Sequence, residues 1–253
     1  MSVRVYLTGD THGEWFERFG SFMFEDGKEL DKDDYLIVIG DFGIWSDSMY
    51  EHFRLDYVNK RPWTTLFIDG NHENFDLLNK FPSQEWHGGK IHVVRPSVFH
   101  LCRGEVFDLC GKRFFTFGGA RSHDISDGIL NPATDPNWDK KARRMQENGQ
   151  HQFRVKGLSW WPEEMPSEDE YKHGLSALQR AGNSVDYILT HDCPTADLQM
   201  LYDSGAQPNE LNKYLSEIDA GTSYKRWYFG HHHADMALPS GHIAMFKRIE
   251  RIV

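Results

Sequence analysis

The sequence has few cysteines and no long apolar run. Its 253 residues include three cysteines, Cys102, Cys110 and Cys193, an odd number without the spacing of a zinc knuckle. This pattern argues against a disulfide framework and predicts reduced thiols, most simply as small buried side chains. No apolar stretch approaches the roughly 18 residues of a membrane helix. A strand that begins by Val3 leaves no room for a signal sequence. We therefore expect a cytoplasmic protein that does not contact membranes.

Basic residues are also scarce. The chain has 28 Lys and Arg against 38 Asp and Glu, which gives a net charge of −10. This balance disfavours nonspecific contact with nucleic acid or anionic lipid, although a local basic groove would override the average. Bound metal ions would offset part of the negative charge. The length is near the upper limit for one hydrophobic core, so a single domain over residues 1–253 is expected.

The chain does contain five apolar runs of strand length, each followed by polar residues of metal-binding types. The runs are residues 3–7, 35–39, 65–68, 185–189 and 227–229. The polar residues are Asp10-Thr11-His12, Gly40-Asp41, Gly70-Asn71-His72-Glu73, Thr190-His191 and Gly230-His231-His232-His233. In an open α/β sheet, ligands bind beyond the carboxyl ends of the strands. The five clusters are therefore predicted to converge on one site.

Each cluster taken alone has a simpler explanation. An Asp after a strand often caps a helix, Asn71 suits a turn, and a lone His191 is usually structural. Three consecutive histidines at 231–233 favour a metal, because imidazole is the commonest metal-binding side chain. Residue type, order and strand context agree across all five clusters, and this joint agreement predicts a metal centre.

Three helical patterns fall between the strands and are predicted to be surface crossovers. One is expected to be capped by Ser46, and another by the capping-box pair Ser167 and Glu170. The residues expected to share a helical face are Met49, Phe53 and Tyr57 in the first, Tyr171, Leu175 and Leu178 in the second, and Leu211, Tyr214, Leu215 and Ile218 in the third.

Two antiparallel units are also predicted. A meander is expected to turn at Cys110-Gly111, and a hairpin near the C-terminus to turn at Pro239-Ser240-Gly241. The expected strands are residues 98–101, 105–109 and 112–117 in the meander, and 236–238 and 243–246 in the hairpin.

Residues 121–166 show little helical or strand periodicity and carry a basic run at 140–144. A long irregular stretch inside a domain is typically a functional loop, so we interpret it as a cap-like insertion over the site. A solvated surface excursion is the alternative. Position and charge make four residues candidate substrate contacts: Arg121, Ser122, His123 and Arg154.

The five clusters together resemble the signature of the calcineurin-like metallophosphoesterase superfamily: Asp-x-His, Gly-Asp, Gly-Asn-His-Glu/Asp, a lone His and Gly-His-x-His. All its elements are present between residues 10 and 233. The resemblance implies an α/β fold, a four-layer α/β/β/α sandwich of two mixed sheets, with two metal ions at the strand ends. His232 fills the variable position and is not an expected ligand. The implied ligands are Asp10, His12 and His233 for one ion, Asn71, His191 and His231 for the other, and Asp41 as the bridge.

The resemblance also implies a mechanism. A metal-bridging hydroxide would attack phosphorus in line, and the two ions would neutralise the developing charge. His72 would stabilise the transition state or protonate the leaving oxygen, a purely structural role being its alternative. Carboxylate, amide and imidazole ligands without thiolate favour Mn²⁺, Fe or Zn²⁺, and also Ni²⁺ or Co²⁺, over Ca²⁺.

Two departures separate this chain from the protein serine/threonine phosphatases of the superfamily. Those enzymes extend the second motif to Gly-Asp-x-x-Asp-Arg-Gly, whereas Ile44 stands here where the Asp would orient the catalytic histidine. Another acid such as Asp47 would then orient His72, or none would. The Arg expected soon after Gly-Asn-His-Glu is also absent. A small bacterial- or phage-type metallophosphoesterase is favoured over a phosphoprotein phosphatase.

The expected substrate is a small phosphorylated metabolite or a nucleotide. A phosphodiesterase or nuclease acting on cyclic nucleotide or nucleic acid is an alternative, with Trp160 and Trp161 as stacking surfaces unless they are packing residues. A noncatalytic protein-binding scaffold is another. Relatives of that kind have degenerate ligand positions, whereas every expected position is filled here.

Overall fold

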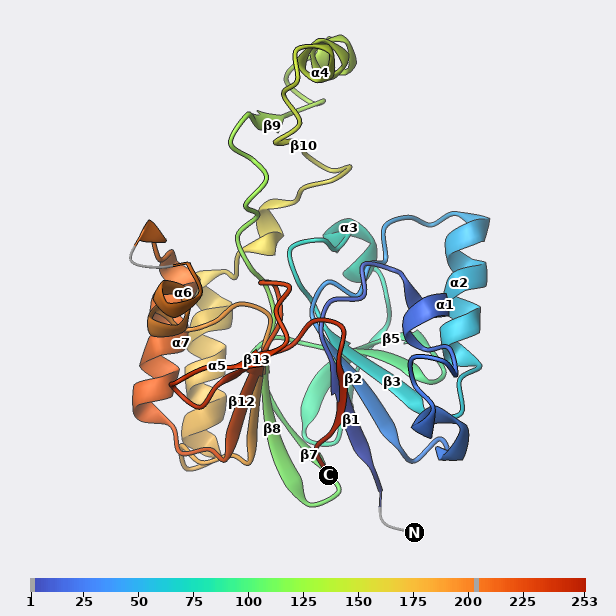
Figure 1. The fold of residues 1–253 in the computed structure, drawn as a ribbon, viewed down its shortest axis with the longest axis vertical. Helices are drawn as coiled ribbons and strands as arrows, with labels where there is room; N and C mark the ends of the chain where they lie inside the picture. Colours follow the sequence, from blue (N-terminus) through green and yellow to red (C-terminus); the bar gives the residue numbers. More distant parts are fainter. Residues whose placement is uncertain (1–2, 203–204) are drawn as a thin grey trace.

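Two mixed β-sheets pack against each other in the computed structural model, which describes residues 3–202 and 205–253 (Figure 1). The strands of the first sheet are β1 (Val5–Thr8), β2 (Tyr35–Ile39), β3 (Thr64–Ile68), β4 (Ser83–Trp86), β5 (Gly89–Arg95), β6 (Val98–Leu101) and β15 (Ile249–Arg251). Those of the second are β7 (Glu105–Leu109), β8 (Lys112–Phe117), β11 (Tyr187–Thr190), β12 (Arg226–Phe229), β13 (Met236–Ala237) and β14 (Ile243–Ala244). Across the described ranges, the strand orders are β15-β1-β2-β3-β6-β5-β4 and β13-β14-β12-β11-β8-β7.

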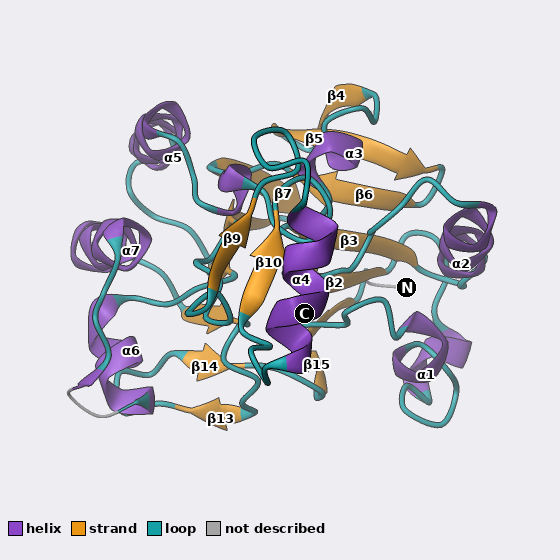
Figure 2. Cartoon of the chain, turned by 90° about the horizontal axis from the view of Figure 1, so that it is seen from above, coloured by secondary structure: helices purple, strands orange, loops and turns teal. Residues whose placement is uncertain are grey.

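Helices flank the paired sheets on both sides (Figure 2). Beside the first sheet lie α1 (Trp15–Arg18), η1 (Asp26–Glu29) and α2 (Met49–Asn59), and α3 (Phe75–Leu78) follows β3. Beside the second sheet lie α5 (Glu168–Arg180), α6 (Thr195–Leu201) and α7 (Glu210–Gly221). The predicted four-layer α/β/β/α sandwich is confirmed. Within residues 3–202 and 205–253, no helix is both long and apolar enough to cross a bilayer.

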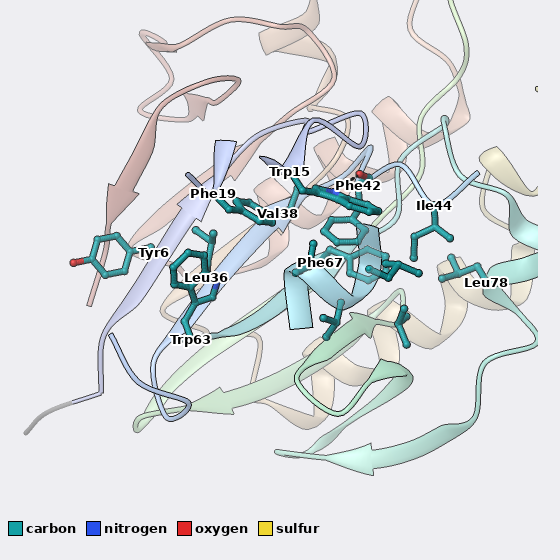
Figure 3. Close-up of a cluster of buried hydrophobic side chains, with 14 of the residues drawn as sticks. Tyr6, Trp15, Phe19, Leu36, Val38, Phe42, Ile44, Trp63, Phe67 and Leu78 are labelled. Atoms are coloured by element: carbon teal, nitrogen blue, oxygen red, sulfur yellow. Dashed lines mark hydrogen bonds between the residues drawn. The ribbon is translucent and has the colours of Figure 1, made fainter. Parts of the chain in front are cut away.

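Strand β2 explains how the layers are held together. Successive side chains of a strand point to opposite faces, so Ile37 packs in the core between the sheets while Leu36 and Val38 face the helices. Because both faces of the strand are covered, its sequence is continuously apolar. On the helix side, Phe42 stacks between Trp15 and Phe67, with ring centroids 4.7 and 4.2 Å away (Figure 3).

Two of the predicted helices are confirmed in their packing and one is not. The capping box of Ser167 and Glu170 is present, and the predicted face of α7 is buried. The cap of α2 is Ser48 rather than Ser46. Of its predicted face, Met49 and Phe53 are exposed and only Tyr57 packs against the core, in which Leu55 and Val58 are buried.

The predicted meander is wrong in one connection. β7 and β8 form the expected hairpin around Cys110 and Gly111. β6, however, pairs with β3 and β5 in the first sheet, so the chain changes sheets between β6 and β7. The C-terminal hairpin of β13 and β14 is confirmed. The β4–β5 hairpin was not predicted, because its exposed first strand lacks an apolar pattern.

Residues 121–166, called the cap from here on, are not irregular. They contain β9 (Gly128–Leu130), α4 (Trp138–Glu147), β10 (Phe153–Val155) and η2 (Pro162–Glu164), with β9 and β10 paired in parallel. A small core of Leu130, Met145 and Val155 holds α4 against the two strands. The unit projects beyond the edge of the sandwich at which β1, β2 and β3 end (Figure 1).

Candidate metal centre

The candidate ligands stand just beyond the carboxyl ends of parallel strands. β2 pairs in parallel with β1 and β3, and β11 pairs in parallel with β12 in the second sheet. Asp10, Asp41 and Asn71 therefore leave the first sheet at the same edge, and His191 and His231 leave the second. Since the two sheets pack face to face, residues more than 200 positions apart in the chain meet there: His12 and His233 place their Nε2 atoms 3.0 Å apart.

Two groups of potential metal ligands form at this edge. The ligand atoms of each group lie within 4.8 Å of one another, and the groups are Asp10, His12 and His233, and Asp41, His191 and His231. Asp41 reaches toward both: its Oδ2 is 3.8 Å from His12 Nε2, and its Oδ1 is 3.4 Å from His191 Nε2. Asn71 Oδ1 also lies 3.4 Å from His191 Nε2. The first group has the same members as one predicted ligand set. The second combines His191 and His231 of the other set with the predicted bridge Asp41, and Asn71 lies beside it. The binding of ions to either group stays a prediction.

The backbone at this edge is strained. His12, Asp41, His231 and His233 have φ angles of 44°, 45°, 63° and 49°, in the left-handed region. Such conformations are uncommon outside glycine and asparagine. Each costs on the order of 1–3 kcal/mol and persists where the surrounding structure over-determines it, typically at functional sites. The strain therefore falls on four of the candidate ligands themselves.

Glycines before the ligands allow the loops to approach one another. A Cβ atom at Gly40 would lie 1.8 Å from His191 Nδ1, and one at Gly70 would lie 2.0 Å from Asp41 Oδ1. Neither contact is sterically possible. The Gly-Asp and Gly-Asn pairs of the sequence therefore reflect close packing between ligand loops.

The donor atoms of the two groups fit divalent cations. Asp10 Oδ2 and His231 Nε2 are buried and make no hydrogen bond within the described residues. Buried polar atoms are rarely left without a partner, and a bound cation would give both of these atoms one. The donor set of carboxylate, amide and imidazole suits Mn²⁺, Fe or Zn²⁺.

Hydrogen bonds orient the ligands from behind. His191 Nδ1 lies 3.0 Å from the Ile39 carbonyl oxygen, to which it must donate, so its Nε2 lone pair faces the centre. Asn71 Nδ2 donates to Ser122 Oγ at 3.2 Å, so Asn71 Oδ1 faces the centre and His191. Ser122 in turn donates to Glu164 at 2.5 Å.

Glu73 holds the loop that carries Asp41. Its carboxylate accepts the backbone N–H groups of Phe42 and Ile44, at 2.7 and 3.3 Å. Burial raises the pKa of Glu73 well above its usual range. Neither Glu73 nor Glu164 was assigned a role from the sequence. Glu73 could have been predicted to have one, because it is the last residue of the Gly-Asn-His-Glu motif, whereas no motif contains Glu164.

The centre pairs buried imidazoles with buried carboxylates. Burial disfavours a charged His191, but Asp41 and Asp10 outweigh this and raise the pKa of His191 to about 10. Burial would likewise raise the pKa of Asp41, yet His191, His72 and His12 hold it far below its usual range. An ionised carboxylate at a buried position attracts positive charge, whether from protons or from metal ions.

A comparison with known families identifies the arrangement. The family model for calcineurin-like phosphoesterases matches residues 3–235. The chain belongs to this family. It is a metal-dependent phosphoesterase.

Other comparisons add little. Among solved structures, the phosphoesterase is similar to the crystal structure of phosphopantetheinyl hydrolase (PptH) from Mycobacterium tuberculosis, with 16% sequence identity and a TM-score of 0.38 over 97% of this chain and 88% of that one. A likeness this distant carries no argument. A comparison with curated protein sequences gives no match.

His72 of the phosphoesterase lies between the centre and the cap. Its backbone N–H donates to Asp41 Oδ1 at 2.8 Å, and its ring centroid is 5.2 Å from that of His12. On the other side, Arg154 Nη2 from β10 is 3.4 Å from His72 Nδ1. A guanidinium only donates, so it faces a lone pair on Nδ1 and leaves the proton on Nε2. Burial is the main cause that lowers the pKa of His72, and Arg154 lowers it further against the opposing effect of Asp41.

Asp47 does not orient His72. It is exposed, and its Oδ1 lies 2.8 Å from His52 Nε2 on α2. The group behind His72 is instead Arg154, whose Nε donates to Asp124 Oδ1 at 3.0 Å. From the sequence, Arg154 was predicted only as a substrate contact, and no role was predicted for Asp124. A pair formed between two distant parts of the cap leaves no pattern in the sequence.

The other candidate substrate contacts differ in position: Arg121 and His123 line cavities beside the centre, whereas Ser122 is buried. A cavity of about 260 Å³ over the centre is lined by residues that include His72, His123 and Tyr202. An adjoining cavity of about 670 Å³ shares His123 and Tyr202 and also includes Arg121. Ser122 lines this second cavity too, but it is buried and its hydroxyl is committed to Asn71 and Glu164. These hydrogen bonds let Ser122 support Asn71, and its contact with substrate stays a prediction.

His232 turns away from the two ligand groups. Its Nε2 lies 3.2 Å from Asp192 Oδ1 and 3.2 Å from Cys193 Sγ. It therefore belongs to neither of them, as expected for the variable position of the last motif.

Proposed function

We propose that the phosphoesterase uses two divalent ions to hydrolyse the phosphate ester of a small phosphorylated metabolite or nucleotide. The observation that carries this proposal is the pair of ligand groups joined at Asp41. One ion would be held by Asp10, His12, His233 and Asp41, and the other by Asn71, His191, His231 and Asp41. When bound, ions at these positions would activate water and neutralise charge on the phosphoryl oxygens.

The chain itself supplies a hydrogen-bond donor beside the ions. With Nδ1 facing Arg154, His72 would present Nε2–H to a phosphoryl or leaving-group oxygen. The ion pair of Arg154 with Asp124 fixes the guanidinium, so His72 is held in one tautomer before substrate binds. Asp124 would thus do from the cap what an acid in the second motif does in protein phosphatases.

The larger cavity supports a small organic leaving group. A phosphoryl group over the metal ligands would lie next to His123 and Tyr202, which also line the cavity of about 670 Å³. Sites of roughly 300–1,000 Å³ are typical of small-molecule ligands. Arg121 would stand at this cavity to bind a further polar or anionic group of the substrate.

A phosphodiesterase or nuclease is the second candidate, supported by α4. Its Lys140, Lys141, Arg143 and Arg144 are exposed, and the helix belongs to the cap beside the site. Of the two tryptophans predicted as stacking surfaces, Trp161 is a packing residue, because it is buried and donates its indole N–H to Asp76 at 2.8 Å. Trp160 is half-buried and stays a prediction. Phosphate contacts from α4 alone would make nucleic acid binding steeply salt-dependent.

The proposal is tested by adding Mn²⁺ back to metal-stripped protein and measuring hydrolysis of p-nitrophenyl phosphate and bis-p-nitrophenyl phosphate. We expect turnover that depends on Mn²⁺ and is faster for the monoester. A clear preference for the diester would favour the second candidate. Folded protein with no turnover in any divalent metal, and with no bound ion by elemental analysis, would overturn the two-ion proposal.

A further inference from the structure

A second cluster of metal-binding side chains lies outside the candidate metal centre. His92, His100 and Cys102 place their ligand atoms within 4.8 Å of one another. They line a cavity of about 560 Å³ that includes residues of α3, η2 and α5, with none of the ligands of the candidate metal centre. The function proposed above gives this cluster no role.

The β5–β6 pair brings the three side chains together. His92 on β5 lies directly opposite His100 on β6. Side chains two residues apart share one face of a strand, so Cys102, just after β6, follows His100 on that face. Ile91 and Leu101 alternate with them and point into the core between the sheets. The register of the sheet therefore fixes two imidazoles and a thiol on the face that borders the cavity.

The spacing within the cluster suits a tetrahedral ion. The Nδ1 atoms of His92 and His100 are 3.1 Å apart. Two nitrogens bound tetrahedrally to Zn²⁺ at about 2.0–2.1 Å would be separated by about 3.3 Å. A movement of a few tenths of an ångström would make room for an ion between them.

His100 already has the partner that metal-bound histidines use. Its Nε2 lies 3.0 Å from Asp69 Oδ1, and Arg103 Nε donates to the other oxygen of Asp69 at 2.8 Å. The Asp69 carboxylate accepts the Nε2 proton, so the Nδ1 lone pair of His100 faces His92. A carboxylate behind a histidine in this way fixes its tautomer and raises its basicity toward a metal.

The charge of the cavity favours a cation. Its lining contains four carboxylates, those of Asp69, Glu105, Glu163 and Glu170, against the cationic side chains of Lys90 and Arg103. Burial, followed by the neighbouring His100 and Lys90, lowers the pKa of His92 to about 4. Burial raises the pKa of the Cys102 thiol to about 12, so a bound metal would have to displace its proton.

We propose that His92, His100 and Cys102 bind a thiophilic divalent ion such as Zn²⁺, separate from the ions of the phosphoesterase centre. Three protein ligands leave a fourth position for water or a small ligand from the cavity. The alternative is that no ion binds here. His92 Nδ1–H then donates a hydrogen bond to His100 Nδ1, and Cys102 takes no part.

Co²⁺ serves as the probe, because a thiolate bound to Co²⁺ gives an intense near-ultraviolet charge-transfer band and the phosphoesterase centre has no thiol among its expected ligands. The metal-stripped full chain is titrated with Co²⁺ and then with Zn²⁺. We expect the band to appear with Co²⁺ and to disappear as Zn²⁺ competes. Absence of the band in folded protein would overturn the proposal.

The cysteines provide matched controls. Cys110 is exposed and is the neutral control, whereas Cys193 lies with Asp192 and His232 in another group of candidate ligands and tests that competing site. The Co²⁺ charge-transfer band should be lost in Cys102→Ser, and His92→Gln should bind Co²⁺ at least tenfold more weakly. The band should be retained in Cys110→Ser and Cys193→Ser. A band that survives in Cys102→Ser, or is lost in Cys193→Ser, would place the thiolate elsewhere and refute the proposal. Unchanged circular dichroism and p-nitrophenyl phosphate hydrolysis in Cys102→Ser would confirm that the variant folds. If neither is preserved, His92→Gln decides the question alone.

Discussion

The edge of the sandwich and the cap contribute to the same site in different ways. At the edge, five of the candidate ligands are buried, and only His12 and His233 reach the surface. Four of the ligands have left-handed backbone, and His191 is held by a hydrogen bond to the end of β2. The cap has a small core of its own around Met145 and presents a largely polar surface. It reaches the centre through Arg154, which faces His72.

This difference separates two tasks. Binding metal ions needs donor atoms fixed within a few tenths of an ångström, which a packed sheet provides because its strand ends cannot move independently. Admitting a substrate needs a surface that can vary, which an insertion outside the main core provides. The four predictions below test whether loss of activity falls off from the sandwich edge to the outer face of the cap.

The largest effect is expected for Asp41→Asn. The substitution removes the negative charge that faces both ligand groups, while the amide keeps the shape. Hydrolysis should fall by at least about 10³-fold, or roughly 4 kcal/mol in the barrier, with loss of at least one ion by elemental analysis. The exposed carboxylate of Asp47 offers a control, since Asp47→Asn should change neither. A variant of Asp41 that kept full turnover and both metals would refute the bridging role.

His72→Ala should reduce kcat by about 10²-fold, in the range for loss of one preorganised hydrogen bond to the charge that develops in the transition state. The metal content should not change, because His72 is in neither ligand group. The matched control is His52→Ala, which removes a surface histidine of α2. Steady-state kinetics of the three proteins provide the measurement. An unchanged kcat in His72→Ala would leave His72 a structural role only.

Arg154→Met should reduce kcat by about tenfold, equivalent to one charge-assisted hydrogen bond. Arg143→Met on the exposed face of α4 is the control and should be neutral. If Arg154 acts through His72, the same loss should appear in Asp124→Asn, and the double variant should lose no more than either single one. Additive losses would mean that the two residues act separately, which would break the proposed link between cap and centre.

The smallest effect is expected on the outer face of the cap. Neutralising Lys140 and Lys141 to Gln should change p-nitrophenyl phosphate hydrolysis by less than about twofold, since exposed substitutions are usually within 0.5 kcal/mol. The same variant should leave single-stranded DNA binding weak at all salt concentrations. If the wild type instead binds DNA with a steep salt dependence that the variant reduces, the cap is a nucleic acid surface and the nuclease candidate is favoured.

Much of the fold was predictable because the buried strands are continuously apolar and end at Gly or polar residues. The runs at 35–39 and 65–68 match β2 and β3 to within one residue. Helix α7 was equally clear from its buried face. Prediction failed for α2, where long apolar side chains lie on the exposed face, and in the cap, whose short strands are stable only because α4 covers them.

The candidate ligands were predictable for the same reason. A parallel strand carries its polar residues to the edge where its neighbours end, so a cluster after each strand predicts convergence. No such rule predicts the position of Asp124 behind Arg154, of Glu164 behind Ser122, or of the cluster of His92, His100 and Cys102. They depend on which strands pair and on where the cap lies.

The sequence by itself determined the family, because its five-cluster signature can be read residue by residue. That resemblance implied the sandwich architecture and the candidate metal ligands, and the apolar runs before the clusters agree with it because they are local properties of the chain. Only the tertiary structure decided what stands behind those ligands. The partner of His72, the task of Ser122 and the second histidine and cysteine cluster arise from contacts between residues that are distant in sequence. Such contacts follow from packing and register, which no short motif encodes.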